Sequence, residues 1–346
     1  MRLFHRRFRS LPTPMAGLAL GVASLGWCME NALPLHGYGQ IIGAVIASCL
    51  LGLLVVRFVC HFDTLWADLK HPVAGSIVPT FAMALMVISK ALGMALPDFS
   101  VVLWCLAVAA HLCALVVFAF HRLRDPNMAQ MVPSWFIPPV GIIVADVTFP
   151  GVPELLPFAL VLLAIGMISY AILLPLMLYR LIFLTEVPNA AKPTIAIMAA
   201  PASLSLAGYL TVVPEPNLLL CAILLGIAVL MTIAIYFAFW NLLRLQFSPG
   251  YAAFTFPMAI GATALYKSSV LVARIPGGET YAEQLHVFAT VELIIASVVI
   301  FYVLSLYLKN LKIYMKALIT NAHQTLNGNK QSLEQTNQIL NFVLAQ

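Results

Sequence analysis

Charged residues are scarce in this sequence. Asp, Glu, Lys and Arg together make up 9% of its 346 residues, whereas 62% are apolar and the mean hydropathy is +0.98. Soluble domains carry about 25% charged residues, so this composition excludes that class and indicates an integral membrane protein. The formal net charge of +5 does not indicate nucleic-acid binding, because the basic residues lie at the ends of apolar segments.

The motifs of common enzymes and metal sites are also missing. No HExxH, GxSG or GxGD pattern occurs, so the zinc, serine and aspartyl intramembrane hydrolases lack their signatures. The six cysteines form no CxxC pair, and the neighbouring Cys60, His61 and Asp63 lack a recognised ligand spacing. We therefore predict no enzyme activity, no cofactor and no metal site. An intramembrane enzyme and a structural scaffold are minor alternatives.

Ten apolar segments, each near the 20 residues or so that cross a bilayer, follow one another along the chain. They predict an all-α polytopic membrane protein with a basic cytoplasmic arm (1–13), a transmembrane pore domain (14–316) and a polar cytoplasmic tail (317–346). The predicted spans are 14–33, 39–61, 73–95, 99–120, 133–149, 154–183, 193–213, 217–243, 250–272 and 282–308.

The basic residues are distributed unevenly between the two ends of these spans. If the N-terminus is cytoplasmic, 15 of the 18 Lys and Arg residues fall on the inner side, and only Lys90, Lys267 and Arg274 fall outside. Cytoplasmic loops are enriched in Lys and Arg. We therefore predict that both termini are cytoplasmic and that the protein lies in the plasma (inner) membrane.

Proline recurs among small residues in every odd-numbered segment, at intervals of 56 to 65 residues, which is one helical hairpin per step. Small residues and kinks suit positions that face protein or water, whereas the Leu-, Val-, Ile- and Phe-rich even segments suit lipid. We predict five helical hairpins in a quasi-five-fold arrangement, with the odd helices kinked at proline around a central pore. The repeated prolines are Pro14, Pro79, Pro139, Pro201 and Pro257.

The ninth segment places a bulky ring beside one of these prolines. Phe256 directly precedes Pro257, and the small residues Gly261, Thr263 and Ala264 follow. A ring above a passage lined by small side chains has the form of a plug. The alternative is that the ring packs against lipid or a neighbouring helix.

Two stretches carry a family resemblance, DLKHPVAGSIVPTFAMALM (Asp68 to Met86) and FTFPMAIGATALYK (Phe254 to Lys267). With the ten spans, they resemble the tellurite-resistance/dicarboxylate transporter family, whose members include the slow-type anion channels of plant guard cells. The resemblance covers about residues 10 to 316. It implies a homotrimer in which each subunit has its own pore, occluded by a phenylalanine at the position of Phe256. Phe254 lies about 200° around a helix from Phe256, so only one of the two rings is expected to face the lumen.

The resemblance implies a membrane channel or transporter for small inorganic or carboxylate anions. The residues alone do not fix the sign of the ion, because a proline kink exposes carbonyl groups that favour cations. The alternative is a proton-coupled dicarboxylate or sulfite carrier, which needs a protonatable group in its path.

Three ionisable residues in the predicted spans bear on ion passage, namely Glu292, Lys267 and Asp146. Glu292 is near mid-bilayer, where an unpaired carboxylate is costly, so it is a possible proton site or ion-pair partner, with Lys267 on the adjacent helix the partner to test. Lys267 is also a possible part of an outer vestibule that draws anions. Asp146, near the outer end of the fifth span, would oppose anion entry if it faced the lumen, so we expect it to point elsewhere.

Overall fold

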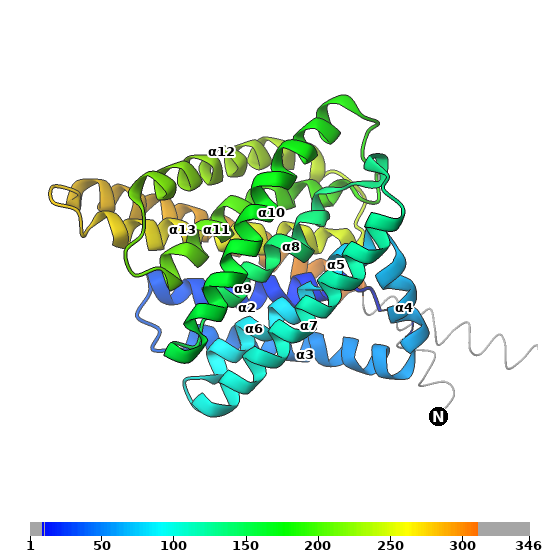
Figure 1. The fold of residues 1–346 in the computed structure, drawn as a ribbon, viewed down its shortest axis with the longest axis horizontal. Helices are drawn as coiled ribbons and strands as arrows, with labels where there is room; N and C mark the ends of the chain where they lie inside the picture. The colour runs from blue at the N-terminus through cyan, green and yellow to red at the C-terminus, as the bar shows by residue number, and fades with distance from the viewer. Residues whose placement is uncertain (1–8, 10, 311–346) are drawn as a thin grey trace, which may run out of the picture.

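The computed structural model describes residue 9 and residues 11–310, and this part of the chain consists of helices without any β-strand (Figure 1). Seven helical stretches within it are long and apolar enough to cross a membrane. They are Tyr38–Cys60 (α3), Ala74–Leu92 (containing α5, Ala74–Ile77, and α6, Thr80–Leu92), Pro97–Arg124 (α7), Pro153–Phe183 (containing α10, Leu156–Phe183), Lys192–Val212 (containing η5, Lys192–Ala199, and α11, Ala200–Val212), Leu218–Leu242 (α12) and Glu279–Asn310.

The other three predicted spans fall on helices that are shorter or less apolar than these seven. They correspond to α2 (Met15–Ala32), to the short apolar helix Pro133–Val147 and to α13 (Phe256–Val272). Helix length and composition therefore support seven crossings directly, and the count of ten stays a prediction. The predicted tail 317–346 and most of the arm 1–13 lie outside the described residues.

The helices differ sharply in burial. In the most apolar stretches of Ala74–Leu92 and Lys192–Val212, 72% and 78% of the residues are buried, against 28% to 39% in the other five long helices. This contrast agrees with an interior of small-residue, proline-containing segments and an outer layer of bulky apolar helices. The quasi-five-fold arrangement and the five hairpins themselves stay a prediction.

The repeated prolines mark where α-helices begin, which differs from the predicted kinks inside continuous helices. Pro14 and Pro79 directly precede α2 and α6, while Pro201 and Pro257 are the second residues of α11 and α13. Pro139 lies in the four-residue α8 (Ile137–Val140). Proline is tolerated in the first turn because the N–H that it lacks would have no partner there. The stretches before α11 and α13 are 3₁₀ helices, namely η5 and η6 (Pro249–Phe254).

Helix α7 holds the broken fifth segment through its backbone. His111 of α7 donates from Nε2 to the carbonyl oxygen of Pro138 at 2.8 Å, and Trp104 of α7 donates from Nε1 to the carbonyl oxygen of Ala145 at 3.1 Å. Both side chains are fully buried. A buried carbonyl without a partner is costly, so these bonds stabilise a segment that has only short helical pieces of its own.

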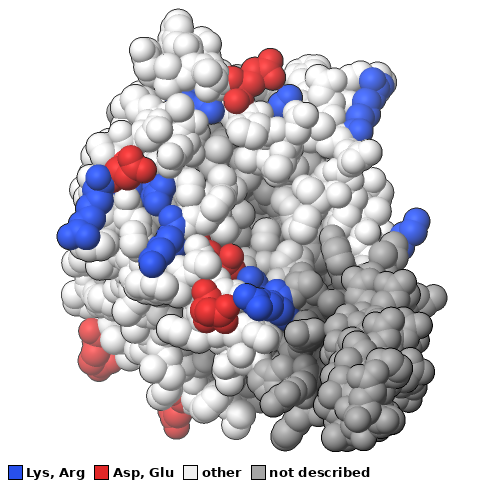
Figure 2. All heavy atoms as spheres, turned by 90° about the vertical axis from the view of Figure 1, so that its right-hand side faces the viewer, with Lys and Arg blue, Asp and Glu red and all other residues white. Residues whose placement is uncertain are grey.

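Polar side chains join several segments at the end of the molecule that carries α4 (Phe62–Lys70). Arg57 at the end of α3 donates to Thr13 Oγ1 at 2.6 Å and to Asp68 of α4 at 2.9 Å. Figure 2 looks onto this end and shows basic and acidic side chains scattered around an uncharged centre. The ends of α3 and α4 and the start of α2 are thus tied together on one side.

Candidate pore

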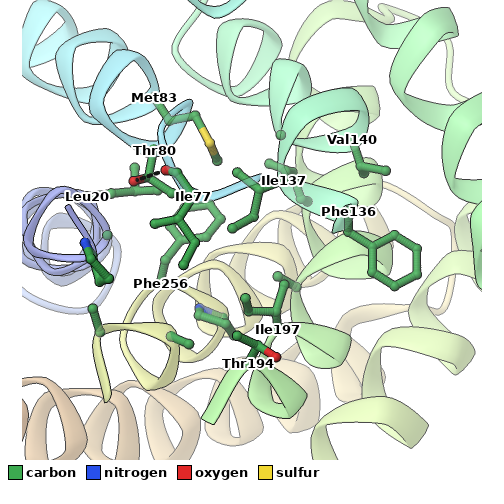
Figure 3. A pocket seen from close by; sticks show the side chains of 18 of the residues that line it. Leu20, Ile77, Thr80, Met83, Phe136, Ile137, Val140, Thr194, Ile197 and Phe256 are labelled. Atoms are coloured by element: carbon green, nitrogen blue, oxygen red, sulfur yellow. Dashed lines mark hydrogen bonds between the residues drawn. The ribbon is translucent and has the colours of Figure 1, made fainter. Parts of the chain in front are cut away.

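A cavity of about 60 Å³ lies where the five proline-containing segments meet. Figure 3 shows side chains from these segments around it, with those of Leu20, Ile77, Ile137 and Phe256 pointing toward one another. Its lining residues are Pro14, Gly17, Leu20, Ile77, Thr80, Met83, Phe136, Ile137, Val140, Gly141, Thr194, Ile197, Ala200, Pro201, Leu204, Gly250, Ala252, Ala253, Phe256 and Pro257.

Most of the lining residues recur at intervals of three within their segments. A spacing of three stacks side chains on one face of a 3₁₀ helix, the geometry that η5 and η6 adopt before their α-helices start. This periodicity around each repeated proline is the sequence signal that could have identified the lining. The sets are Pro14, Gly17 and Leu20; Ile77, Thr80 and Met83; Ile137 and Val140; Thr194, Ile197 and Ala200; and Gly250, Ala253 and Phe256.

Phe256 is the first residue of α13 and contributes the aromatic ring from that segment to the cavity. The residue before it is held in place, because Thr255 Oγ1 lies 2.7 Å from the carbonyl oxygen of Ala252 and 3.2 Å from that of Gly17 on α2. The ring position is thereby set by contacts to its own 3₁₀ turn and to the neighbouring inner helix.

Phe254 points away from this cavity. Its ring is fully buried and packs against Tyr251, with 4.8 Å between the ring centroids, and against Phe239 of α12 at 5.3 Å. Of the two rings that the sequence left as alternatives, Phe256 is the one that lines the cavity.

The predicted pore-lining prolines divide into two groups. Pro14, Pro201 and Pro257 line the cavity, whereas Pro79 and Pro139 do not. The neighbours of the second pair take their place, since Thr80 and Val140 face the cavity instead. Residues at and just after the helix starts supply much of the lining, and three of the five repeated prolines are among them.

The lining carries no Asp, Glu, Lys, Arg or His side chain. Its two hydroxyl groups are engaged locally, because Thr80 Oγ1 donates to the carbonyl oxygen of Ile77 at 2.7 Å and Thr194 Oγ1 to that of Ala191 at 2.6 Å. A passage of this kind discriminates among ions by width and by the cost of dehydration rather than by fixed charge.

Residues 12–308 match the SLAC1 family, described as voltage-dependent anion channels. The chain belongs to the SLAC1 family. It is similar to two uncharacterized transporters of Methanocaldococcus jannaschii. One is 28% identical over 252 residues, covering 64% of this chain and 70% of the relative. The other is 26% identical over 241 residues, covering 61% and 68%. The protein is therefore a membrane protein of a transporter and channel family, as the two signature stretches indicated.

Glu292 of this SLAC1-family chain lies away from the cavity. It is 6% exposed, accepts a hydrogen bond from the Tyr236 hydroxyl of α12 through Oε2, and finds no partner for Oε1 among the described residues. The ammonium group of Lys267, the partner that the sequence suggested, instead lies 6.0 Å from the centroid of the Trp27 ring of α2. Lys267 lies on α13, ten residues beyond Pro257, and its side chain is half-buried. It is near enough to Lys90 for the two positive charges to interact.

Asp146 is a buried carboxyl group whose environment the sequence did not reveal. It lies in the four-residue α9 (Val144–Val147), is fully buried, and neither carboxyl oxygen has a hydrogen-bond partner among the described residues. It does not line the cavity, as expected, but packs near Gly208 of α11. The described residues hold no group of three or more His, Cys, Asp or Glu that could bind a metal ion.

Proposed function

We propose that the protein is an anion conduit whose path runs through the cavity between the five proline-containing segments. The observation that carries this proposal is the convergence of all five segments, 56 to 65 residues apart in sequence, on one uncharged cavity. Membership of a family described as anion channels supports small anions as the permeant species. The seven long apolar helices support a path across a bilayer.

Phe256 closes this path in the proposed resting state. Its ring lies in the cavity together with Leu20, Ile77 and Ile137, which leaves a space of only about 60 Å³. That volume is comparable to a few water molecules and is too small for a continuous aqueous passage. Removal of the ring would join the space that it occupies to the cavity.

The test is chloride flux into proteoliposomes that contain the wild type or Phe256→Ala. We expect Phe256→Ala to raise the flux sharply and Phe256→Tyr, which keeps a ring of the same width, to leave it low. Equal fluxes for the wild type and Phe256→Ala would contradict the gate.

Phe254→Ala is the control for loosened packing. Because Phe254 is fully buried, its truncation is expected to cost about 3–5 kcal/mol of stability without opening the cavity. A flux that rises as much in Phe254→Ala as in Phe256→Ala would mean that general loosening, and not removal of a plug, admits the ion.

A proton-coupled dicarboxylate or sulfite carrier is the second candidate. The observation that favours it is Asp146, a fully buried carboxyl group that packs near Gly208 of α11 and has no hydrogen-bond partner in the part of the chain that the structure describes. Glu292 supports this candidate less because it lies on the outer side of α13. A carrier of this type would accumulate the anion against its gradient when a proton gradient is imposed, whereas a channel would not.

The assembly and orientation are part of the same proposal. We propose a homotrimer with one pore per subunit, ten crossings and both termini cytoplasmic, in the plasma (inner) membrane. The uneven distribution of Lys and Arg supports the orientation. Accessibility of single cysteines introduced at Arg9 and Arg274 to a membrane-impermeant thiol reagent would test it, since only the second is expected to react from outside.

A further inference from the structure

Two lysines lie beyond the candidate pore, toward the ends of two inner helices. Lys90 is on α6, eleven residues after Pro79. Lys267 is on α13, ten residues after Pro257. The two lysines therefore occupy nearly equivalent positions in the third and ninth segments, at the end that the proposed orientation places outside. Their positive charges are near enough to interact.

Both lysines lie on the helix faces that line the cavity. Lys90 follows the lining residue Met83 by seven residues, which is about two turns of α6. Lys267 follows the lining residue Phe256 by eleven residues, which is about three turns of α13. Residues separated by whole turns share one face of a helix, here to within about 20°. The faces that line the cavity therefore carry the two lysines farther along, toward the outer end of the conduit.

Two further inner segments reach the same lysines. Trp27 of α2 follows the lining residue Leu20 by seven residues, and its ring centroid lies 6.0 Å from Lys267 Nζ. Lys90 Nζ donates to the carbonyl oxygen of Phe149, at the end of the fifth segment, at 3.0 Å. Four of the five proline-containing segments thus meet around the two lysines.

The two positive charges have no acidic partner among the described residues. None of the ion pairs in that part of the chain includes Lys90 or Lys267. Glu30 of α2 is already engaged, because its two carboxylate oxygens accept from the backbone N–H groups of Gly37 and Gly39 at 3.0 and 2.8 Å. Like charges that lie close together without a counter-charge repel each other, so an anion between them is stabilised by both.

The two ammonium groups keep hydrogen-bond donors for such an anion. Each ammonium group has three donors, and Lys90 uses one of them on Phe149. Lys267 Nζ makes no hydrogen bond to a described residue, and it is not one of the polar atoms that are sealed from solvent without a partner. Both side chains are half-buried, so they are held by their surroundings without being covered.

From these observations we propose that Lys90 and Lys267 form a binding site for one divalent oxyanion at the outer end of the conduit, with the Trp27 ring as its apolar wall. The charge of one divalent anion balances two ammonium groups, and its several oxygens can accept from both. A halide ion balances only one of them. Resting on the proposed function, a divalent anion held here occupies the entrance and slows the entry of chloride.

The binding test is thermal unfolding of the full chain in detergent at pH 7, in sodium sulfate and in sodium chloride of equal ionic strength. A ligand that binds only the folded state raises the melting temperature, so we expect sulfate to raise that of the wild type by roughly 2–5 °C more than chloride does. Lys90→Gln and Lys267→Gln are expected to lose this difference, and Lys90→Arg and Lys267→Arg to keep it. Arg274→Gln, which removes an exposed charge beyond α13, is the control and keeps it as well.

Each variant is compared with itself in the two salts, so a variant that is merely less stable still reports on binding. A difference between the salts that is as large in both Gln variants as in the wild type would overturn the proposal, because sulfate would then act as a general stabiliser of folded proteins. So would equal melting temperatures of the wild type in the two salts.

The flux arm is read separately from the melting temperatures. Sulfate on both faces of the proteoliposome membrane, at constant ionic strength, is expected to lower chloride flux through the Phe256→Ala variant. When Lys267→Gln is added to that variant, the sulfate concentration that halves the flux is expected to rise about tenfold. Equal inhibition of both would overturn a block at this site. If sulfate raises the melting temperature through the two lysines but no variant conducts chloride, the proposed function fails and the binding site stands.

Discussion

Gly21 of α2 lies directly against Thr255, the residue that precedes Phe256. A Cβ atom built on Gly21 would lie 2.3 Å from Thr255 Oγ1 and 3.1 Å from the backbone nitrogen of Phe256. At the first distance something must move, the second is a tight contact, and Thr255 is a fully buried side chain. The absence of a side chain at Gly21 is what allows α2 to approach the start of α13.

Gly21→Ala is therefore expected to destabilise the protein by about 1–3 kcal/mol, because overpacking of a close contact forces a backbone shift. Gly17→Ala, four residues earlier on the same helix, is the control, since its Cβ atom would make an ordinary contact of 3.6 Å with Ala252 Cβ. Thermal unfolding in detergent measures the difference. Equal melting temperatures for the two variants would show that the Gly21 contact is not tight in solution.

Arg57→Ala is expected to cost about 3 kcal/mol, because it leaves the Asp68 carboxylate without its buried partner. The Arg57 side chain is only 7% exposed, and Asp68 is 22% exposed. Arg9→Ala breaks a bridge to Asp63 in which both side chains are 64% exposed, and is expected to cost less than about 1 kcal/mol. If thermal unfolding shows that both variants lose a similar amount of stability, burial does not make the Arg57–Asp68 bridge more stabilising than the exposed Arg9–Asp63 bridge.

Lys267→Gln is expected to lower chloride flux through the Phe256→Ala variant by roughly twofold to tenfold at low ionic strength, with a smaller effect in high salt, because charges at a pore mouth concentrate the counter-ion. Arg274→Gln is the matched control, since Arg274 is exposed beyond the end of α13. A loss that is independent of salt would indicate a structural defect at Lys267 instead of a field effect.

Asp146→Leu is expected to raise the melting temperature, with a gain of about 1 kcal/mol, since an apolar side chain of similar size replaces a buried carboxyl group that has no hydrogen-bond partner within residues 11–310. The same variant separates the two candidate functions. A channel keeps its chloride flux, whereas a proton-coupled carrier loses its response to an imposed proton gradient. A lower melting temperature would show that the carboxyl group has a partner, such as a bound ion.

The sequence predicted an all-helical membrane protein and the seven long apolar helices, because long apolar runs are a local signal, whereas the count of ten spans and the five-fold repeat stay predictions. It did not predict that an α-helix starts at Phe256 after a 3₁₀ turn, because both conformations satisfy the same composition. The separation of Phe254 from Phe256 depends on packing against Phe239, a contact between two helices. The hydrogen-bond partner of Glu292 could not be predicted either, because Tyr236 lies 56 residues away on another helix. A tyrosine in an apolar helix gives no local sign of which residue it will contact.

The hydrogen bonds that α7 makes to the fifth segment also affect which ions the inner wall can stabilise. A cation in a narrow passage needs carbonyl oxygens in place of its lost hydration shell. The oxygens of Pro138 and Ala145 are directed outward, to His111 and Trp104. These two oxygens are therefore engaged by α7, and in the proposed conduit they would not replace the water that a cation loses, so α7 would favour anions without touching the ion.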